Sequence, residues 1–437
     1  MRPITKEEEK EVDWWFPSSE DEIMNRLDIA SKRNLSYQDH PILVFPGTCA
    51  HPIACQAFSR FLAPNPNNIM THTRGMSEKG FVGTQQLEVE VITMLGRMLG
   101  DSYCDGYFAS GGTEANIWGA WIGRNYLLSS EKVGSGEICV IASHQYHYSG
   151  RKACDLLGLG EGIFGECKKC NEDHIFTPKD LGGLHLVGTN QKGEIDLQQL
   201  REQIVNQFEK GVRRFMIFLT MGTTMMGAID DVKGVEKIVE EFPKADFYVH
   251  LDAAFGGFIV PFLPHLKEKA IAFHSPIVKS VTIDVHKMGL APYPAGIALC
   301  RKDLQRFIQR PTGYVNSGMD DTVCGSRSGA AAASVWAVMS YLGPKGYREE
   351  AEKCMKWTEE LKFGLENIGI KVYPHTINIL LADLGGKSIN EDKYILVTDH
   401  MPSDLTDPNS CRKILYKFTL MHHTQDGEIA EFISHLR

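Results

Sequence analysis

Residues 281–290, V-T-I-D-V-H-K-M-G-L, place a lysine directly behind an apolar stretch. The run Val281, Thr282 and Ile283 is typical of the end of a buried strand, and Lys287 follows shortly after it. Burial of an amine favours its uncharged form, which can attack a carbonyl and hold an imine. We therefore predict that Lys287 is an imine-forming lysine. The alternative is a surface lysine just past the end of a strand.

A second stretch, S-G-G-T-E from Ser110, combines small residues with the expected start of a helix near Glu114. Small residues at that point let backbone N–H groups reach a phosphate, and the helix dipole favours an anion there. The alternative is an ordinary glycine-rich helix start with Thr113 as its cap. The stretch matches neither a Walker loop nor the dinucleotide-binding fingerprint.

An acidic residue, Asp252, directly follows the expected strand 247–251. A carboxylate at the mouth of a sheet can bind a ring nitrogen. The small residues Ala253, Ala254 and Gly256 leave room for a flat ring beside it. The alternative is an aspartate that caps a helix.

Two more expected strand ends carry polar side chains. His147 follows the strand 138–142, and its ring can stack on an aromatic cofactor, the alternative being a structural histidine. Thr223 and Thr224 follow the strand 215–219 and offer hydroxyl groups. Taken together, the four strand ends predict a phosphate cradle, an acid for a pyridine nitrogen, a stacking ring and an imine-forming lysine.

The elements that must position these residues alternate between helices and short apolar strands. Strands separated by helices indicate crossover units and a mostly parallel sheet with helices on both faces, and ligands collect at the carboxyl ends of such strands. After Pro344 the pattern predicts a smaller α+β domain. The expected strands are 138–142, 215–219, 247–251, 281–283 and 297–300, and the expected helices are 85–99, 346–368 and a last one from Gly427.

Composition narrows the class of protein. The 437 residues favour two domains over one, and 43% hydrophobic with 23% charged residues is typical of a soluble globular protein. A net charge of −9 argues against nucleic-acid binding. The charged N-terminus lacks the apolar region of a signal peptide, and no apolar stretch is long enough to span a membrane. The eleven cysteines are scattered, which favours a reduced, cytoplasmic location.

A metal site is not expected. Cys167, Cys170 and His174 form a C-x-x-C-x-x-x-H pattern, and Cys154 would supply a fourth ligand. This spacing fits no standard zinc site. The region 160–182 is better explained as a surface insertion.

The order of five motifs resembles that of the group II pyridoxal-phosphate decarboxylases, above all the archaeal-type tyrosine/aspartate decarboxylase family. The similarity covers roughly residues 40–385 and, more loosely, the tail. It implies pyridoxal 5'-phosphate as cofactor and α-decarboxylation of an aromatic or acidic L-amino acid to the amine and carbon dioxide. The alternative is a carbon–carbon lyase with the same cofactor, resembling sphingosine-phosphate lyase. The motifs are S-G-G-T-E-A-N, Y-H-Y-S, G-T-T-M-M-G-A, H-L-D-A-A-F-G-G-F and I-D-V-H-K-M-G-L-A-P.

The resemblance also implies a fold and an assembly. The fold would be aspartate-aminotransferase-like (fold type I), and the protein would be a homodimer with shared active sites. We expect residues 1–60 to form an N-terminal segment that packs on the dimer partner. Residues 61–315 would form the large cofactor-binding domain, and residues 316–437 the connecting helix and the small C-terminal domain.

Roles for individual residues follow from the same resemblance. Lys287 would form the internal aldimine, Asp252 would pair with the pyridinium nitrogen and His147 would stack on the ring. Lys417 stands where family members carry an arginine near the substrate. The other implied site residues are Gly112, Thr113 and His286 near the phosphate, Ser326 reaching it from the neighbouring subunit, Ala254 beside the ring, Thr223 or Thr224 near the ring hydroxyl or the substrate carboxylate, Cys49 and His51 near the substrate, and Tyr314, which would protonate the quinonoid carbon.

Overall fold

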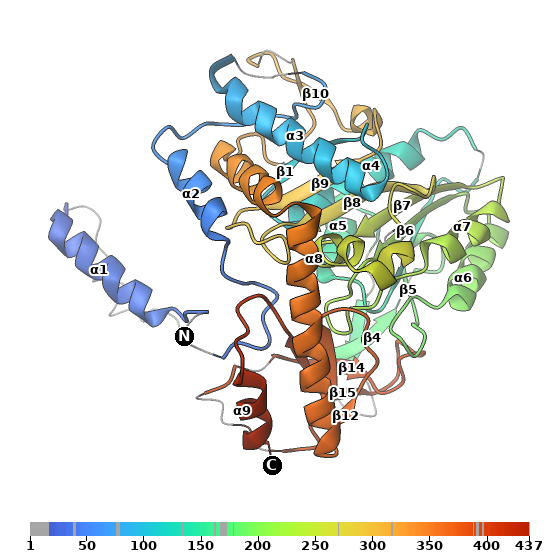
Figure 1. The fold of residues 1–437 in the computed structure, drawn as a ribbon. Helices are drawn as coiled ribbons and strands as arrows, with labels where there is room; N and C mark the ends of the chain where they lie inside the picture. The colour runs from blue at the N-terminus through green and yellow to red at the C-terminus, as the bar shows by residue number, and fades with distance from the viewer. Residues whose placement is uncertain are drawn as a thin grey trace. The chain divides into compact units, whose positions relative to one another are not determined.

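The computed structural model, drawn as a ribbon in Figure 1, forms two compact units, Met1–Pro41 and Ile42–Arg437. In the first unit, helix α1 (Glu20–Arg33) begins with a capping box between Ser19 and Glu22. The structure describes residues 17–37, 41–75, 79–132, 134–160, 163–166, 173–177, 179–269, 271–315, 318–387, 389, 393–395 and 397–436.

A seven-stranded sheet forms the centre of the second unit, in the order β1-β9-β8-β7-β6-β2-β5. β9 runs antiparallel to both of its neighbours, and the other pairs are parallel. All five predicted strands are present, and β1 and β5 are two additional strands of the same sheet. The strands are β1 (Asp105–Ala109), β2 (Ile138–Ser143), β5 (Gly183–Val187), β6 (Arg214–Thr220), β7 (Asp246–Asp252), β8 (Val278–Asp284) and β9 (Gly296–Cys300).

Helices cover both faces of this sheet, as Figure 1 shows. Side chains alternate between two apolar clusters: Val140 packs in the cluster that contains Trp118 of α4, and Ile141 packs in the one that contains Leu200 of α6. Burial on both faces explains why the strands are apolar throughout. The predicted fold class is therefore confirmed. The covering helices are α3 (Val82–Leu99), α4 (Gly112–Leu128), α5 (Tyr148–Leu157), α6 (Leu197–Glu209) and α7 (Val232–Glu240).

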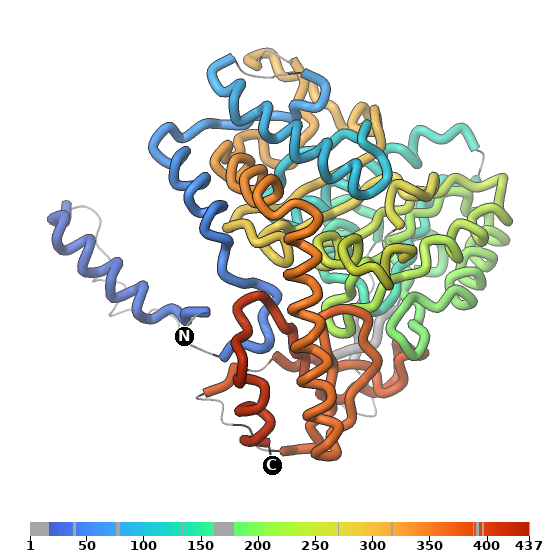
Figure 2. The backbone as a smooth tube through the Cα atoms, in the orientation of Figure 1, coloured from blue at the N-terminus to red at the C-terminus, as the bar shows by residue number. Residues whose placement is uncertain are grey.

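The smaller C-terminal part begins with one long helix, α8 (Gly329–Asn367), which bends at Gly343, where φ is +56°. The predicted helix 346–368 is the part after this bend, and the structure extends the helix upstream to Gly329. Figure 2 shows the second part of α8 running down to the C-terminal strands. These form an antiparallel sheet of β12 (Lys371–Val372), β13 (Ile379–Asp383), β15 (Arg412–Thr419) and β14 (Val397–Pro402), followed by α9 (Glu428–His435).

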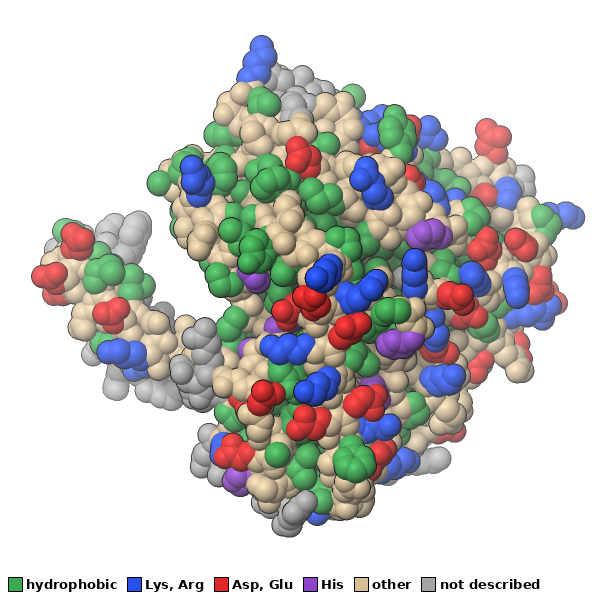
Figure 3. Space-filling view, viewed as in Figure 1, with side chains coloured by type: hydrophobic (Ala, Val, Ile, Leu, Met, Phe, Trp, Pro, Cys, Tyr) green, Lys and Arg blue, Asp and Glu red, His purple; other side chains and the backbone are tan. Residues whose placement is uncertain are grey.

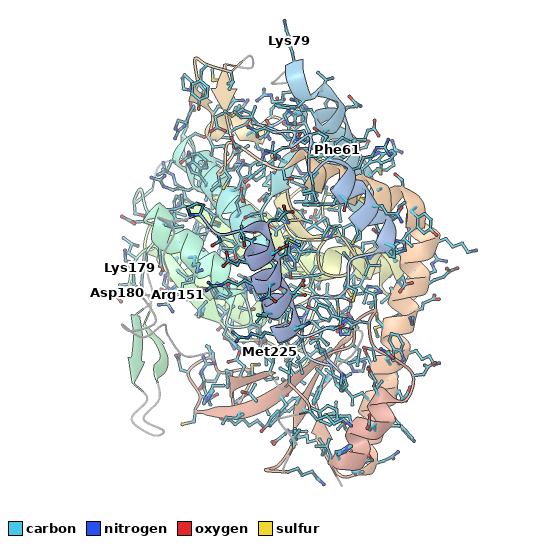
Figure 4. The ribbon with its side chains drawn as sticks, turned by 90° about the vertical axis from the view of Figure 1, so that its left-hand side faces the viewer. Phe61, Lys79, Arg151, Lys179, Asp180 and Met225 are labelled. Atoms are coloured by element: carbon cyan, nitrogen blue, oxygen red, sulfur yellow. The ribbon has the colours of Figure 1, made fainter. Side chains whose placement is uncertain are left out.

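The turn after β6 connects the two sheets. Met225, labelled above the C-terminal strands in Figure 4, belongs to an apolar cluster with Leu381, Met401 and Leu415. Smaller elements complete the fold: α2 (Pro52–Arg60), the hairpins β3 (Ile163–Glu166) with β4 (Asp173–Thr177) and β10 (Arg310–Pro311) with β11 (Met319–Asp320), and 3₁₀ turns at Lys79–Phe81, Gly256–Phe258, Val260–Phe262, Pro264–Lys269 and Leu304–Phe307.

Two sequence predictions concerned a metal site and a membrane span. Cys167, Cys170 and the side chain of His174 lie outside the described residues, while Cys154 is buried in α5. Within the described part of the chain, every helix is too short or too polar to cross a bilayer.

Candidate active site

The carboxyl ends of β1, β2, β6, β7 and β8 meet at one edge of the sheet, where ligands bind in folds of this kind. Two adjoining cavities open there, and both are lined by His147, Ala254 and Lys287. We call the larger one, of about 310 Å³, the cradle cavity, because the start of α4 lines it. The smaller one, of about 170 Å³, is the inner cavity, and it is also lined by Asp252 and by residues of β13 and β15.

Lys287 lies in the turn after β8, with its amine at the boundary of the two cavities. Its Nζ is 2.9 Å from Asp284 Oδ2. Burial acts to lower the pKa of Lys287, but the Asp284 carboxylate outweighs burial, so the pKa lies above its usual value. Desolvation therefore acts on the amine as expected, but the acid at the end of the same strand, which the expectation left out, makes the ammonium form the favoured one.

Asp284 is a site residue that the sequence reasoning missed, although it directly ends the β8 strand. Its carboxylate is 4% exposed, and one oxygen approaches both Lys287 and, at 3.6 Å, His286 Nε2. The His286 ring stacks against Tyr293, with 4.1 Å between ring centroids. His286 Nδ1 is buried, with no side-chain hydrogen-bond partner among the described residues, and the Ala295 backbone lies close to the ring. Burial lowers the pKa of His286, so an uncharged ring is favoured.

The start of α4 has the backbone geometry of an anion site. Gly111 precedes the helix without a side-chain cap, so the alternative in which Thr113 caps the helix is wrong. The first N–H groups of a helix that lacks a cap are free to bind an anion. A Cβ at Gly112 would lie 2.8 Å from Asp284 Oδ2, and a Cβ at Gly296 would lie 2.4 Å from the Gly111 backbone. Only glycine therefore lets the cradle close on these neighbours.

Asp252 ends β7 and is 8% exposed. Its Oδ1 accepts a hydrogen bond from the Ala254 N–H at 3.0 Å, and its Oδ2 accepts one from Asn116 Nδ2 at 2.7 Å. The carboxylate is thus held in place by two donors while one side faces the inner cavity. Asn116 is a second residue that sequence reasoning missed. It lies in the S-G-G-T-E-A-N motif, but nothing in the local pattern shows that its partner is Asp252.

His147 is the residue before α5 and lines both cavities. Its Nδ1 lies 2.7 Å from Ser149 Oγ, which also accepts a hydrogen bond from Asn116. The ring is 4.2 Å from that of Tyr148, centroid to centroid. Burial lowers the pKa of His147, although Asp252 opposes the effect. A neutral, fixed ring of this kind is suited to stacking on a flat cofactor.

The two threonines after β6 differ in position. Thr223 is fully buried, and its Oγ1 accepts a hydrogen bond from the Ala228 N–H at 3.0 Å, which closes the turn. Thr224 lines the inner cavity. Thr220 and Thr419, which the sequence did not indicate, line it as well. Of the two residues left open by the motif, Thr224 is the one whose side chain can reach a ligand.

Lys417 lies on β15, opposite Leu381 of β13, and lines the inner cavity although it is only 5% exposed. Burial and the Lys287 charge together lower the pKa of Lys417 to about 8, while Asp399 acts in the opposite direction. A buried ammonium group in a cavity is stabilised when an anion binds beside it. Lys417 is therefore a candidate for holding a carboxylate.

Five predicted residues do not line the two cavities of their own chain: Thr223, described above, and the four that follow. Tyr314 is 82% exposed, and Ser326 is exposed, with its Oγ accepting a hydrogen bond from Asn67. Cys49 and His51 lie before α2, where His51 accepts a hydrogen bond from Ile53 N and caps the helix. Their predicted roles at a shared site stay predictions.

The residues at this edge fit pyridoxal 5'-phosphate. The uncapped start of α4 and the buried His286 Nδ1 suit its phosphate, and Lys287 suits its aldehyde. Asp252 suits its ring nitrogen, and His147 suits the face of its ring. Gly112 has no side chain that would crowd the cradle cavity. The phosphate, the aldehyde, the ring nitrogen and the face of the ring thus each have a counterpart with matching chemistry.

Comparison with known proteins agrees with this fit. The profile of the pyridoxal-dependent decarboxylase conserved domain matches residues 81–370. A tryptophan decarboxylase of Clostridium sporogenes is 30% identical over 441 residues and 97% of each chain. A probable L-tyrosine/L-aspartate decarboxylase of Methanothermobacter thermautotrophicus is 32% identical over 335 residues, which cover 76% of this chain and 79% of the relative.

Among solved structures, L-methionine decarboxylase of Streptomyces sp. 590 superposes with a TM-score of 0.78 over 97% of both chains, at 18% identity. At that identity the likeness shows the fold alone, while the profile match and the sequence relatives show the family. The chain therefore belongs to the pyridoxal-dependent decarboxylases and is an amino acid decarboxylase that uses pyridoxal 5'-phosphate.

Proposed function

We propose that this enzyme removes the α-carboxylate of an aromatic L-amino acid and releases the amine and carbon dioxide. The observation that carries the proposal is the position of Lys417. Among the described residues that line the inner cavity, Lys417 and Lys287 are the only cations. The rest of the lining combines Asp252, His147 and three threonines with an apolar surface formed by Pro46, Phe255 and Ile379. One carboxylate of the substrate can pair with Lys417 there, and the side chain of the substrate then contacts the apolar surface of the cavity.

The cofactor, when bound, supplies an electron sink for the bond that breaks. Lys287 binds its aldehyde, and the Asp252 carboxylate holds a proton on its ring nitrogen. Lys417 attracts the substrate carboxylate toward β15, which fixes the bond to be broken relative to the ring plane. Tyr314 of the neighbouring subunit would deliver a proton to the α-carbon that has lost its carboxylate. Lys287 would then bind the aldehyde carbon again and displace the amine.

An acidic substrate fits the inner cavity less well. Aspartate would bring a second carboxylate. With Lys417 paired to the first carboxylate and Lys287 assigned to the cofactor, no other described cation in the lining is left for the second. An unpaired buried carboxylate is unfavourable by several kcal/mol, roughly, after relaxation of its surroundings. The indole or phenol of an aromatic substrate avoids this cost. The name of the Clostridium relative, tryptophan decarboxylase, supports the same choice.

We expect carbon dioxide release, measured across the twenty amino acids, to be fastest with aromatic L-amino acids, about 100-fold above aspartate in kcat/KM, which corresponds to about 2.7 kcal/mol. Analysis of the product distinguishes the possible reactions, because decarboxylation yields the amine and cleavage by a carbon–carbon lyase yields an aldehyde. Release that is fastest with aspartate would reject the aromatic proposal, and an aldehyde without carbon dioxide would reject decarboxylation.

Lys417 should govern substrate affinity in a pH-dependent way. Its pKa of about 8 means that the ammonium form, which binds a carboxylate, is present below pH 8 and is lost as the pH rises through that value. We expect KM to rise above pH 8 in the wild type. In Lys417→Met, KM should be about tenfold higher at pH 7, because a charge-assisted contact of about 1.5–3 kcal/mol is missing. Lys417→Arg should move the rise in KM to higher pH, and a KM profile unchanged in Lys417→Met would contradict the assignment.

We also propose a homodimer in which each active site uses residues of both subunits. Figure 3 shows apolar side chains gathered over the region of α2 and α3, and the exposed residues there include Leu62 and Val82. Exposed apolar surface of this kind is typical of a subunit interface. Tyr314 is exposed to solvent. Ser326 is held in place by its neighbour Arg327, whose Nη1 is 2.5 Å from the buried Glu88.

The proposed partner contacts extend to the N-terminal segment, residues 1–60. On α1, the side chains of Ile23, Met24 and Leu27 are exposed although they are apolar. An amphipathic helix gains stability mainly when its apolar side chains are covered. We propose that the partner subunit covers them.

A further inference from the structure

A chain of buried polar side chains runs behind Asp252, away from the inner cavity. Asn116 Nδ2 lies 2.7 Å from Asp252 Oδ2, and Asn116 Oδ1 lies 2.9 Å from His250 Nε2. His250 Nδ1 lies 2.7 Å from Ser280 Oγ, which is 2.8 Å from the hydroxyl of Tyr248. Asn116 is 1% exposed, and the three residues behind it are fully buried. The chain is therefore shielded from solvent along its length.

The carboxylate fixes the direction of each hydrogen bond in this chain. An ionised carboxylate only accepts hydrogen bonds, so the Asn116 amide must turn its NH₂ group to Asp252 and its carbonyl to His250. A carbonyl also only accepts, so His250 carries its proton on Nε2. Burial lowers the pKa of His250 to about 4, against the opposing effect of Asp252, so the ring is neutral and its Nδ1 accepts. Ser280 therefore donates to His250, and Tyr248 donates to Ser280.

We propose that Asn116 is a positioning residue that holds the Asp252 carboxylate in place for the ring nitrogen of pyridoxal phosphate, and that His250 holds the Asn116 amide in the required orientation. This inference rests on the role proposed for Asp252. All the hydrogen bonds of the chain point their protons toward the carboxylate, and such chains strengthen one another in a low-dielectric interior. Each carboxylate oxygen has a second lone pair, so the donors leave room for the cofactor.

Asn116 is suited to this position because it is also tied to the stacking histidine. Its Nδ2 lies 2.7 Å from Ser149 Oγ as well, so both of its N–H protons have an acceptor. Ser149 Oγ in turn lies 2.7 Å from His147 Nδ1. An aspartate at 116 would put two carboxylates in contact, and a leucine would offer no donor. Of side chains of this size, an amide alone satisfies His250, Asp252 and Ser149 together.

The test uses holoenzyme loaded with pyridoxal phosphate that is isotopically labelled at its ring nitrogen. The nitrogen chemical shift in NMR reports protonation of the ring directly and is independent of turnover. We expect a protonated ring nitrogen in the wild type and a shift toward the unprotonated position in Asn116→Leu, with the dissociation constant of the cofactor raised about tenfold. Asn125→Leu is the matched control. Asn125 lies on the same helix and donates to Phe307 O at 2.8 Å, so this variant loses an amide hydrogen bond away from the site.

Two more variants make the NMR experiment conclusive whatever the result with Asn116→Leu. His250→Phe keeps an aromatic ring next to Phe218 but removes the donor to Asn116, so it should shift the ring nitrogen in the same direction by a smaller amount. If Asn116→Leu does not fold, an unchanged resonance in His250→Phe overturns the inference. Asp252→Asn distinguishes the role of Asp252 from that of Asn116. An unchanged resonance in Asp252→Asn rejects the role of Asp252 itself, whereas a shift in Asp252→Asn without one in Asn116→Leu rejects only the role of Asn116.

Discussion

Replacement of Lys287 by alanine should reduce turnover by about 10⁵-fold, the lower end of the advantage that a tethered reacting group supplies. The reason is that Lys287 Nζ lies at the boundary of the two cavities, where the aldehyde of the cofactor must be bound and released in each cycle. Borohydride reduction of the wild type, followed by peptide mapping, should place the cofactor on Lys287. The purified wild type should be yellow, and this colour should be altered in Lys287→Ala.

Two other lysines serve as controls for this experiment. Lys279 lies on the same strand, β8, and donates to Pro276 O at 3.0 Å, so Lys279→Ala should retain the colour and the turnover. Lys417 lines the same cavity and has a pKa of about 8, so it is the other candidate for attack on an aldehyde. Covalent label on Lys417 in the wild type would overturn the assignment of Lys287.

A mixture of two inactive variants should recover activity if the active site is shared. Tyr314→Phe should lower the yield of amine by about 10²-fold, because a positioned proton donor contributes 10²–10⁴-fold. Heterodimers of Tyr314→Phe with Lys287→Ala contain one site with both an intact Lys287 and an intact Tyr314. Purified through two different tags, such heterodimers should show about half of the wild-type turnover, since one of the two equivalent sites is restored.

The control for this mixture is the double variant Lys287→Ala/Tyr314→Phe. Mixed with Tyr314→Phe, it offers no intact tyrosine, so the same heterodimers should stay inactive. Recovery in the first mixture alone supports the shared site. Equal amine yield from Tyr314→Phe and the wild type would reject Tyr314 as the proton donor, and verified heterodimers without recovery would reject its location over the neighbouring subunit's site.

The part of the site that could be predicted from sequence is the part that is local in the chain. Asp252 and Lys287 directly follow apolar strands, so a pattern of a few residues identifies both. The pattern cannot identify partners from other elements. Asn116 and Asp252 are joined only because α4 packs against β7, and Lys417 enters the inner cavity only because β15 pairs with β13. Such contacts depend on sheet order and register, which no local spacing contains.

The mistakes have physical causes as well. The charge of Lys287 was misjudged because burial and the Asp284 carboxylate act in opposite directions on its pKa, and only the distance of 2.9 Å shows that the carboxylate prevails. The upstream part of α8 was missed because Gly343 and Pro344 are typical of the end of a helix. The backbone does leave the helical conformation at Gly343, but a helical segment also precedes it, so α8 consists of two segments joined at a kink.

The antiparallel strand β9 has a consequence for the order in which the protein assembles. β9 pairs with β8 across a short connection, Asp284 opposite Gly296, so the turn that carries Lys287 can form early from neighbouring residues. On its other side β9 pairs with β1, Phe108 opposite Ile297, and this contact joins segments that are distant in the chain. Closing so long a loop is slower and has a larger entropic cost. The phosphate cradle after β1 therefore comes next to the lysine only when β1 has paired with β9, so cofactor binding depends on the pairing of two segments that are distant in the chain.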